Sequence, residues 1–423
     1  MPPITLAVLG GSGVGTPELF HALLHWPANA RPEMRVILLG RPGRSEHKLE
    51  RVRQISQRLV RQANPPIEVE STTNWRAGLA GADYVLNQVR IGGLAARAHD
   101  ETFPQALGIA GEETIGPGGF ANALRTIPPV LEALRLVNEV APQAVVLNLT
   151  NPAGIVQHAA GRYTDTRFIS LCDSPMTLAE DVAKLVKLPR EEVHIDYLGM
   201  NHLGWITGVH NEAGDLMDQA LERIEQLPYL GVDSTYIRAT RAIPIPYVRY
   251  YLHPQRMLAQ QQGKTPRARQ LQELEKELLA AFEQAEAEDD PSRILGRRGA
   301  LWYSAIIIPV LDAMVNDRNS IWVVNIVNND QVSWLPSETV IEVPVHINRR
   351  GIHPLPIPED TLSEGLRALL YAQAAYEALA VPAIVEQKRD LALQALVAHP
   401  LIRSIEQAEA VVQAVWPAGG IEV

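Results

Sequence analysis

The stretch Ile4-Thr5-Leu6-Ala7-Val8-Leu9-Gly10-Gly11-Ser12-Gly13-Val14-Gly15 decides the fold. Its first six residues are mostly apolar and run directly into glycines, which predicts a buried parallel strand followed by a tight turn. Thr16-Pro17-Glu18-Leu19 then opens a helix, since proline suits the first turn and glutamate favours its positive end. The pattern indicates a dinucleotide site at Gly10, Gly11, Ser12 and Gly13, where backbone and helix N–H groups meet a pyrophosphate. The spacing is not a clean G-x-G-x-x-G, and a tight turn without a ligand remains the alternative.

Strands and helices alternate along the first half of the chain. Apolar runs predict further strands, and helical spacing predicts helices between them, at Met34–Leu39, His47–Leu59, Ile67–Glu70, Tyr84–Val89, Ile127–Val140, Ala144–Leu149 and Phe168–Leu171. This alternation is typical of an α/β fold with a doubly wound parallel sheet. The length of 423 residues exceeds one usual core, so we expect two domains, 1–195 and 196–423. Later strands at Trp322–Val327 and Val340–Val345 predict a mixed sheet in the second domain.

Composition excludes several classes of protein. The formal net charge is −10, which gives no basic field for nucleic acid. The single cysteine permits no intrachain disulfide, which fits a reducing compartment. The N-terminus has no basic region or cleavage site of a signal peptide, and no apolar run approaches the ~20 residues of a membrane span. We therefore expect a cytoplasmic protein that binds a small molecule and neither nucleic acid nor membrane.

The end of the second strand reads Leu39-Gly40-Arg41-Pro42-Gly43-Arg44. An Asp or Glu usually stands there in proteins that bind the unphosphorylated ribose of NAD. The two arginines Arg41 and Arg44 would instead suit a 2′-phosphate. The cofactor can therefore be NAD or NADP. Two solvated arginines without a ligand explain the same sequence equally well.

Two residues in distant segments are candidate metal ligands. Cys172 and His202 offer thiolate and imidazole, a pair that borderline-soft divalent metals accept. A lone cysteine is more often a small apolar core residue, and a lone histidine is more often only hydrogen-bonded. The polar neighbours Asp173 and Asn201 favour the metal interpretation.

Three further segments carry polar side chains of interest. Asn151 follows the strand Ala144–Leu149, at the sheet edge where ligands bind in α/β folds, although asparagine before proline is also ordinary turn chemistry. Tyr247–Tyr251 contains three tyrosines, and such a cluster usually packs an interface; a tyrosine serves as a base only if its pKa falls, which a metal can cause. The charged, leucine-periodic segment 267–286 predicts an exposed amphipathic helix, which we interpret as a solvated structural element.

These motifs, taken in order, resemble glycoside hydrolase family 4, whose NAD- and metal-dependent mechanism departs from the two-carboxylate scheme. The resemblance covers most of the chain and rests on Gly10–Leu19, Gln88–Leu94, Gly111–Gly119, Thr150–Gly154, Cys172–Pro175, Asn201-His202, Tyr247–Tyr251, Tyr303-Ser304 and Asn325–Asn329. It implies a Rossmann domain followed by a lactate/malate-dehydrogenase-like α+β domain, in a homodimer or homotetramer. Many members act on 6-phosphoglycosides.

The resemblance also implies a reaction without net oxidation. NAD takes hydride from carbon 3 of the sugar, a base removes the proton on carbon 2, the aglycone leaves, water adds and the hydride returns. A divalent metal, expected to be manganese, polarises the sugar oxygens. The implied roles are metal binding by Cys172 and His202, proton removal by Tyr247, acid catalysis by Asp173, cofactor contact by Arg41 and Asn151, and sugar or phosphate contact by Asn151, Asn201, Arg90 and Arg298.

The anomer of the substrate stays open. Family members resembling phospho-α-glucosidases carry aspartate after the cysteine, as Asp173 does here, whereas Val89–Leu94 and Lys264–Arg267 resemble the β-type members. A non-phosphorylated α- or β-glycoside, reached by the same mechanism, is an alternative. Two other classes share the fold: an NAD-dependent 2-hydroxy-acid dehydrogenase, which needs no metal, and a non-catalytic sensor of nucleotide or sugar phosphate.

Overall fold

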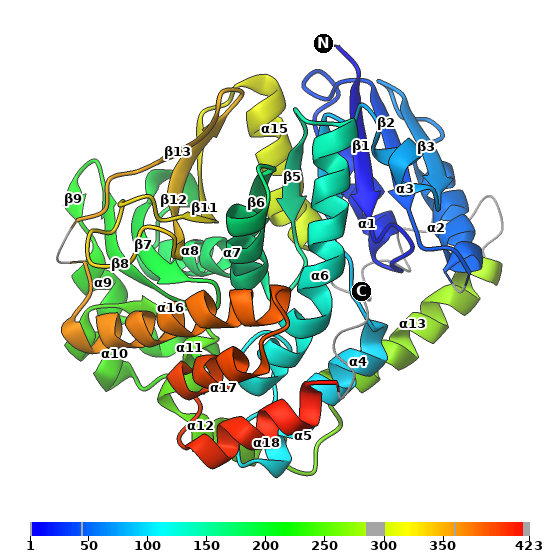
Figure 1. The fold of residues 1–423 in the computed structure, drawn as a ribbon. Coiled ribbons are helices and arrows are strands. Elements are labelled where there is room, and N and C mark those ends of the chain that lie inside the picture. The colour runs from blue at the N-terminus through cyan, green and yellow to red at the C-terminus, as the bar shows by residue number, and fades with distance from the viewer. Residues whose placement is uncertain (1, 44, 285–300, 359–360, 418–423) are drawn as a thin grey trace.

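The computed structural model describes residues 2–43, 45–284, 301–358 and 361–417. Its strands are β1 (Ile4–Leu9), β2 (Met34–Leu39), β3 (Ile67–Thr72), β4 (Tyr84–Asn87), β5 (Val145–Asn148), β6 (Arg167–Leu171), β7 (His194–Met200), β8 (Leu203–Asn211), β9 (Gly214–Asp215), β10 (Ile243–Pro244), β11 (Ser320–Val327), β12 (Val340–Asn348) and β13 (Gly351–Pro354). All thirteen join one sheet, in the order β10-β8-β7-β12-β11-β6-β5-β4-β1-β2-β3 (Figure 1). The strands β13 and β9 pair with β12 and β8 off this path.

The sheet has a parallel half and an antiparallel half. Strands β3, β2, β1, β4, β5 and β6 pair in parallel, whereas β11, β12, β7, β8 and β10 pair antiparallel. The order 3-2-1-4-5-6 is that of a doubly wound Rossmann sheet, which confirms the predicted fold class. Successive strands are added on one side of β1 up to β3 and on its other side from β4 onward. The carboxyl ends of β1 and β4 therefore border one crevice at this switch point. The Rossmann topology thus defines in advance where a ligand binds.

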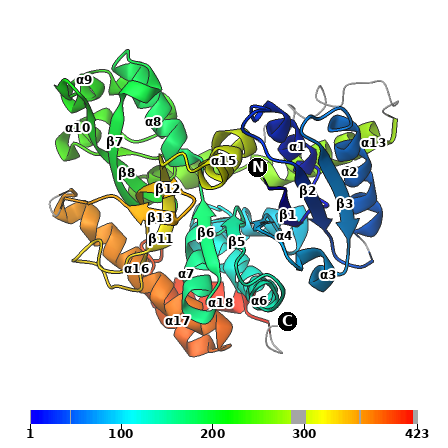
Figure 2. The same ribbon diagram turned by 90° about the horizontal axis from the view of Figure 1, so that it is seen from above.

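Helices cover both faces of the sheet (Figure 2). They are α1 (Thr16–His25), α2 (Glu46–Leu59), α3 (Trp75–Leu79), α4 (Gly93–Asp100), α5 (Phe103–Ala106), α6 (Gly116–Val140), α7 (Ala153–Tyr163), α8 (Ser174–Leu185), α9 (Met217–Glu222), α10 (Ser234–Thr240), α11 (Val248–Leu252), α12 (Pro254–Gln261), α13 (Arg267–Gln284), α15 (Ile308–Asn316), α16 (Glu364–Val385), α17 (Arg389–Ala398) and α18 (Ile405–Val415). Successive side chains of β1 point to opposite faces. Leu6 and Val8 join a core with α1, α2, α8 and α15, whereas Ala7 and Leu9 join one with α6, α7, α17 and α18.

The predicted helix at Ile127–Val140 is longer than expected. It begins at Gly116, as the 25-residue α6. The glycines and Pro117 of its first turn do not show the apolar spacing by which the sequence analysis located helices. Proline is nevertheless tolerated there, because an N–H in the first turn of a helix has no acceptor within the helix. The added turns direct Glu113 and Thr114 toward the carboxyl end of the sheet, where they enter the site described below.

The sequence was expected to hold no apolar run near the length of a membrane span, and the helix α16 is an exception to that expectation. The helix α16 contains an 18-residue window of mean hydropathy 1.4, long and apolar enough by composition to cross a membrane. Its buried residues, such as Leu366, Leu370 and Ala380, belong to the two main cores, and it packs against α17, α6 and α7. We interpret α16 as a core helix whose apolar side chains belong to both cores of the fold.

Candidate active site

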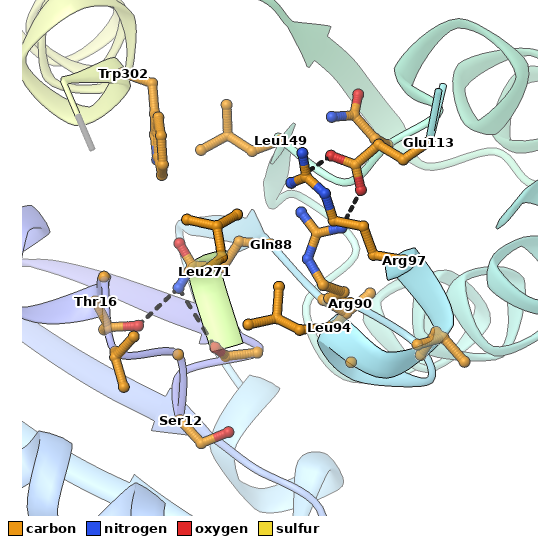
Figure 3. A pocket seen from close by; sticks show the side chains of 18 of the residues that line it. Ser12, Thr16, Gln88, Arg90, Leu94, Arg97, Glu113, Leu149, Leu271 and Trp302 are labelled. Carbon is orange, nitrogen blue, oxygen red and sulfur yellow. Dashed lines mark hydrogen bonds and ion pairs between the residues drawn. The ribbon is translucent and has the colours of Figure 1, made fainter. Parts of the chain in front are cut away.

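The principal cavity of the described residues has a volume of about 680 Å³ and opens at the carboxyl ends of β1, β4 and β6. Figure 3 shows its middle part, with Gln88 between the glycine loop and the residues near Glu113. The predicted site residues that line it are Gly10, Ser12, Gly13, Arg41, Arg90, Asn151, Cys172, Asp173, His202 and Tyr247. Folding thus brings the candidate dinucleotide loop and the candidate metal ligands into one chamber.

The glycine loop has the geometry of a phosphate cradle. Gly10 has a left-handed φ of 81°, and a Cβ there would lie 2.9 Å from the carbonyl oxygen of Gln88. Only glycine therefore fits between β1 and β4. The helix α1 begins at Thr16 with no side-chain cap, but Thr16 N–H donates to Gly13 O, Glu18 N–H donates to Gly15 O, and Pro17 has no N–H. The positive end of the helix thus favours an anion by its dipole, and the N–H donors have to come from the loop. Gly11 does not line the cavity; its N–H donates to Leu39 across 2.9 Å and fixes the loop to β2.

Gln88 connects this loop to the far side of the cavity. Its Nε2 donates to Thr16 Oγ1 at 2.9 Å, and its Oε1 accepts from the hydroxyl of Tyr303 at 2.7 Å. Tyr303 lies in a π-helical turn, a form often found at functional sites. Trp302 lines the cavity beside it (Figure 3). The glycine loop is therefore held by hydrogen bonds to a segment about 290 residues away.

Cys172 and Asp173 follow β6 directly, at its carboxyl end. Burial raises the pKa of the Cys172 thiol, and the nearby Glu342 and Asp173 carboxyls raise it further. Burial also raises the pKa of Asp173. Without a cation, this pocket favours a neutral thiol and makes ionisation of the Asp173 carboxyl less favourable than in water. A thiolate here needs a positive partner, as a bound divalent metal would be.

His202 occupies the two-residue turn between β7 and β8, with a left-handed φ of 62°. Its Nδ1 lies 2.7 Å from Thr114 Oγ1, and the same hydroxyl donates to Glu112 Oε2. Burial raises the pKa of Glu112 to about 7, and above this pH Glu112 can only accept. Since a hydroxyl has one hydrogen, Thr114 then accepts from His202 Nδ1–H. Nε2 is then unprotonated, which is the form that binds metals. Burial lowers the pKa of His202 to about 4, which keeps the ring neutral at physiological pH.

Tyr247 stacks on the imidazole of His202, with ring centroids 3.7 Å apart and planes 4° apart. Burial raises its pKa well above that of free tyrosine, and carboxyls at Glu112 and Glu113 add to this effect. The side chains of this chain therefore disfavour the phenolate. A positive charge from a ligand is needed before Tyr247 can take a proton.

Two arginines share the carboxylate of Glu113. Arg90 pairs with one of its oxygens, and Arg97 Nη1 lies 2.7 Å from the other (Figure 3). Arg97 also pairs with Glu101 at 2.6 Å. The arginines hold the pKa of the buried Glu113 carboxyl below its usual range. The two arginines and the two carboxylates balance in charge, but Arg90 and Arg97 line the cavity, where guanidinium donors suit an anionic substrate group.

Asn201 lies outside the principal cavity. It lines a second, very small cavity of about 10 Å³ with Gly154 and Glu377. Its Nδ2 donates to Glu342 Oε1 at 3.3 Å, and Asn325 Nδ2 donates to the same oxygen at 3.0 Å. The sugar contact expected for Asn201 thus has no geometric support. Arg298 lies outside the described residues.

Several lining residues escaped the sequence interpretation. Glu113 and Thr114 stood within a quoted motif but received no role. Lys48, Trp75, Arg267, Leu271 and Glu275 also line the cavity. Three of these come from α13, which we interpreted as a solvated helix; its periodic Leu271, Leu278 and Phe282 are in fact buried. The helical spacing of the leucines was the signal that could have revealed this, because an apolar stripe on a helix packs against another surface.

The residues fit both ligands that the motifs indicated. For a dinucleotide, the glycine loop turns at the left-handed Gly10 and lines the cavity directly before the N-terminus of α1. For a divalent metal, the donor set is a buried thiol and an imidazole in its metal-binding tautomer. Among the described residues, no group of three His, Cys, Asp or Glu side chains forms a ready metal cage. Cys172 and His202 would therefore leave coordination positions open to substrate or water.

Comparison with known proteins identifies the family. Residues 7–188 match the profile of family 4 glycosyl hydrolases, and residues 197–402 match the C-terminal domain of the same family. A probable 6-phospho-beta-glucosidase of Bacillus subtilis is 30% identical over 95% of this chain and 93% of its own length. The chain belongs to glycosyl hydrolase family 4. The predicted family and the predicted class of enzyme, an O-glycosyl hydrolase, are confirmed.

Two further relatives bear on substrate and cofactor. The 6-phospho-beta glucosidase of Thermotoga maritima, solved with manganese, NAD+ and glucose-6-phosphate, is 29% identical with a TM-score of 0.87 and covers 97% of each chain. A phospho-alpha-glucosidase of Clostridium acetobutylicum is 26% identical over 97% of this chain and 96% of its own length. A lactate dehydrogenase from a deep-sea metagenome, 13% identical over 91% of this chain and 100% of its own, with a TM-score of 0.56, shares the fold alone. The cofactors NAD and manganese thus occur in a solved member of the family.

Proposed function

We propose that this family 4 enzyme hydrolyses a 6-phosphoglucoside by transient oxidation at carbon 3. The observation that carries the proposal is the meeting of the glycine loop, Cys172, Asp173, His202 and Tyr247 in one cavity. When bound, NAD+ supplies a reversible hydride acceptor, and a divalent metal, Mn²⁺ by analogy with the Thermotoga relative, supplies Lewis-acid charge that lowers the pKa of nearby hydroxyls.

The proposed roles of the side chains follow from their places in the cavity. Cys172 and His202 hold the metal, with Thr114 fixing the imidazole tautomer. Tyr247, stacked on His202, removes the proton on carbon 2. Asp173, whose carboxyl lines the cavity beside Cys172, protonates the leaving oxygen.

Substrate and cofactor contacts complete the proposal. Gly10, Ser12 and Gly13 bind the pyrophosphate, with Arg41 at the adenosine end and Asn151 nearer the reacting sugar. Arg90 and Arg97, which line the cavity, donate to the 6-phosphate. Arg298 is kept as a second proposed contact of the sugar phosphate.

For the anomer we propose a β-linkage. The β-specific relatives share 29–30% of their residues with this chain, compared with 26% for the α-specific relative. The aspartate at position 173 remains the argument for the α-anomer. A homodimer or homotetramer, a cytoplasmic location and the division into domains 1–195 and 196–423 are further parts of the proposal.

The decisive experiment is hydrolysis of four p-nitrophenyl substrates, α- and β-glucosides with and without a 6-phosphate. Each is assayed with NAD+, Mn²⁺ and a mild reductant, and again with EDTA. We expect release from the 6-phospho-β-glucoside alone, lost with EDTA, without accumulation of NADH. Net NADH production would favour a dehydrogenase, and release indifferent to nucleotide and metal would refute the mechanism.

A further inference from the structure

The adenosine end of the cavity has no acidic side chain on β2. The strand ends at Leu39, and Gly40 and Arg41 follow. A Cβ at Gly40 would lie 2.9 Å from Leu49 Cδ2, the end of a flexible side chain, so a larger residue there requires Leu49 to move. The usual carboxylate that binds the ribose 2′-hydroxyl is therefore missing from its usual position.

Charged groups from three elements gather at this end instead. Arg41 lies with its guanidinium carbon 6.0 Å from the ring centroid of Trp75, and Lys48 of α2 pairs with the carboxylate of Glu275 on α13. The side chains of Lys48 and Glu275 each keep 28% of their surface exposed, so the pair remains accessible. All four residues line the cavity. Two cations and one carboxylate thus surround the place where the adenosine ribose would lie.

The helix α13 holds Glu275 in a fixed place. Near its beginning, the N–H of Ala268 donates to Glu101 Oε2 at 2.8 Å. Further along, Leu278 and Phe282 form a small core with Val14 of the glycine loop and Ile55 of α2. Figure 1 shows α13 running alongside α4 and below α2. Because the beginning and the end of α13 are both attached to the nucleotide-binding half, the helix holds Glu275 in a fixed position in the cavity wall.

We propose that Glu275 is the carboxylate that selects the cofactor. It accepts a hydrogen bond from the ribose 2′-hydroxyl of NAD+ while it keeps its pair with Lys48, since a carboxylate has about four acceptor positions. The Glu275 carboxylate also repels a 2′-phosphate, and its ion pair with Lys48 keeps that ammonium from neutralising the phosphate. Without Glu275, Arg41 and Lys48 form a site for a phosphate dianion. Selection between NAD+ and NADP+ therefore lies on α13 and not on β2. This inference rests on the proposed use of a dinucleotide at this site.

The test is calorimetric titration of the full chain with NAD+ and with NADP+, in EDTA and without sugar, so that binding alone is measured. We expect the wild type to bind NAD+ more tightly than NADP+. Glu275→Gln should shift the ratio of the two dissociation constants toward NADP+ by about tenfold or more, the size of one or two charge-assisted hydrogen bonds. Adding Lys48→Met to Glu275→Gln should reverse most of that shift.

Glu273→Gln is the matched control, because Glu273 lies on the same helix, is 68% exposed and pairs with Lys276 away from the cavity. An equal shift in Glu273→Gln and Glu275→Gln would reduce the effect to net charge and overturn the inference. A wild type that prefers NADP+ would also overturn it. Failure of the proposed function has a different signature: the expected ratios would appear in an enzyme that releases no p-nitrophenol from any of the four substrates.

Discussion

At the scale of single residues, Thr114 tests the tautomer of His202. Thr114→Val removes the acceptor of the Nδ1 proton while it preserves shape, so the imidazole can turn or change tautomer. We expect Mn²⁺ affinity to fall by about 10- to 100-fold, the usual effect of losing an outer-shell partner. Titration calorimetry with Mn²⁺ measures it. Thr114→Ser keeps the hydroxyl and should bind Mn²⁺ as the wild type does; a weaker serine variant would indicate a packing effect instead.

Glu377 tests the cost of a buried carboxyl. Burial raises its pKa to about 7, and the nearby His158 gives no positive charge because burial lowers its pKa to about 4. The folded state thus holds the carboxyl proton more tightly than the unfolded state. This stabilises the fold below the unfolded pKa of 4.5, and the stabilisation is lost as the pH rises through about 7. Glu377→Gln should therefore gain stability relative to the wild type, by about 3 kcal/mol, between pH 4.5 and 8.

Urea unfolding at both pH values measures this difference. Gln373 can still donate to the oxygen of the new amide, as it does to Glu377 Oε1 at 3.0 Å. The control is Glu364→Gln on the same helix, which is 87% exposed and should show no such trend. A constant offset between Glu377→Gln and wild type at all pH values would contradict the raised pKa.

At the scale of elements, one small core attaches the second half of α13. Leu278 is fully buried there against Val14, Ile55 and Phe282. Leu278→Ala should weaken the docking of α13 by about 2–4 kcal/mol, through lost apolar contact and the cavity left behind. Hydrogen exchange should accelerate in residues 267–284 more than in β1 or β4. Lys276→Ala, at an exposed position of the same helix, serves as control; equal protection in both variants would show that α13 is held by other contacts.

At the scale of the whole molecule, the continuous sheet argues that the proposed domains do not fold separately. The strand β6 pairs with β11 through Leu171 and Ser170, and the core around α8 also contains Val343 and Val345 of β12. A fragment of residues 1–195 loses these partners and exposes an unpaired strand edge. We expect it to aggregate or to unfold without a cooperative transition, as ultracentrifugation and urea unfolding would show. A monomeric fragment with a sharp transition would establish an autonomous domain.

The sequence predicted what local patterns encode. Short apolar runs ending in glycine or polar residues located β1, β2, β5 and β6, and with them residues at their carboxyl ends, such as Asn151 after β5 and Cys172 after β6. Long-range pairing is not local, so nothing near Val324 reveals that it bonds to Leu171. Glu275 was overlooked because a charged helix has the same sequence whether its charges meet solvent or a cavity wall. Asn201 was placed next to the sugar from its neighbour His202, but adjacent residues of a hairpin turn can point to different cavities.

The place of β11 and β12 in the sheet has a consequence for synthesis on the ribosome. These two strands lie between β6 and β7, yet they come roughly 150 residues after β6. At 5–20 residues per second, translation therefore leaves the edge of β6 open for roughly 8 to 30 s. During that interval the nascent chain presents unpaired backbone groups to other nascent chains on the same messenger. Synonymous codons that slow translation between β6 and β11 should therefore lower the soluble yield without altering a single residue of the finished enzyme.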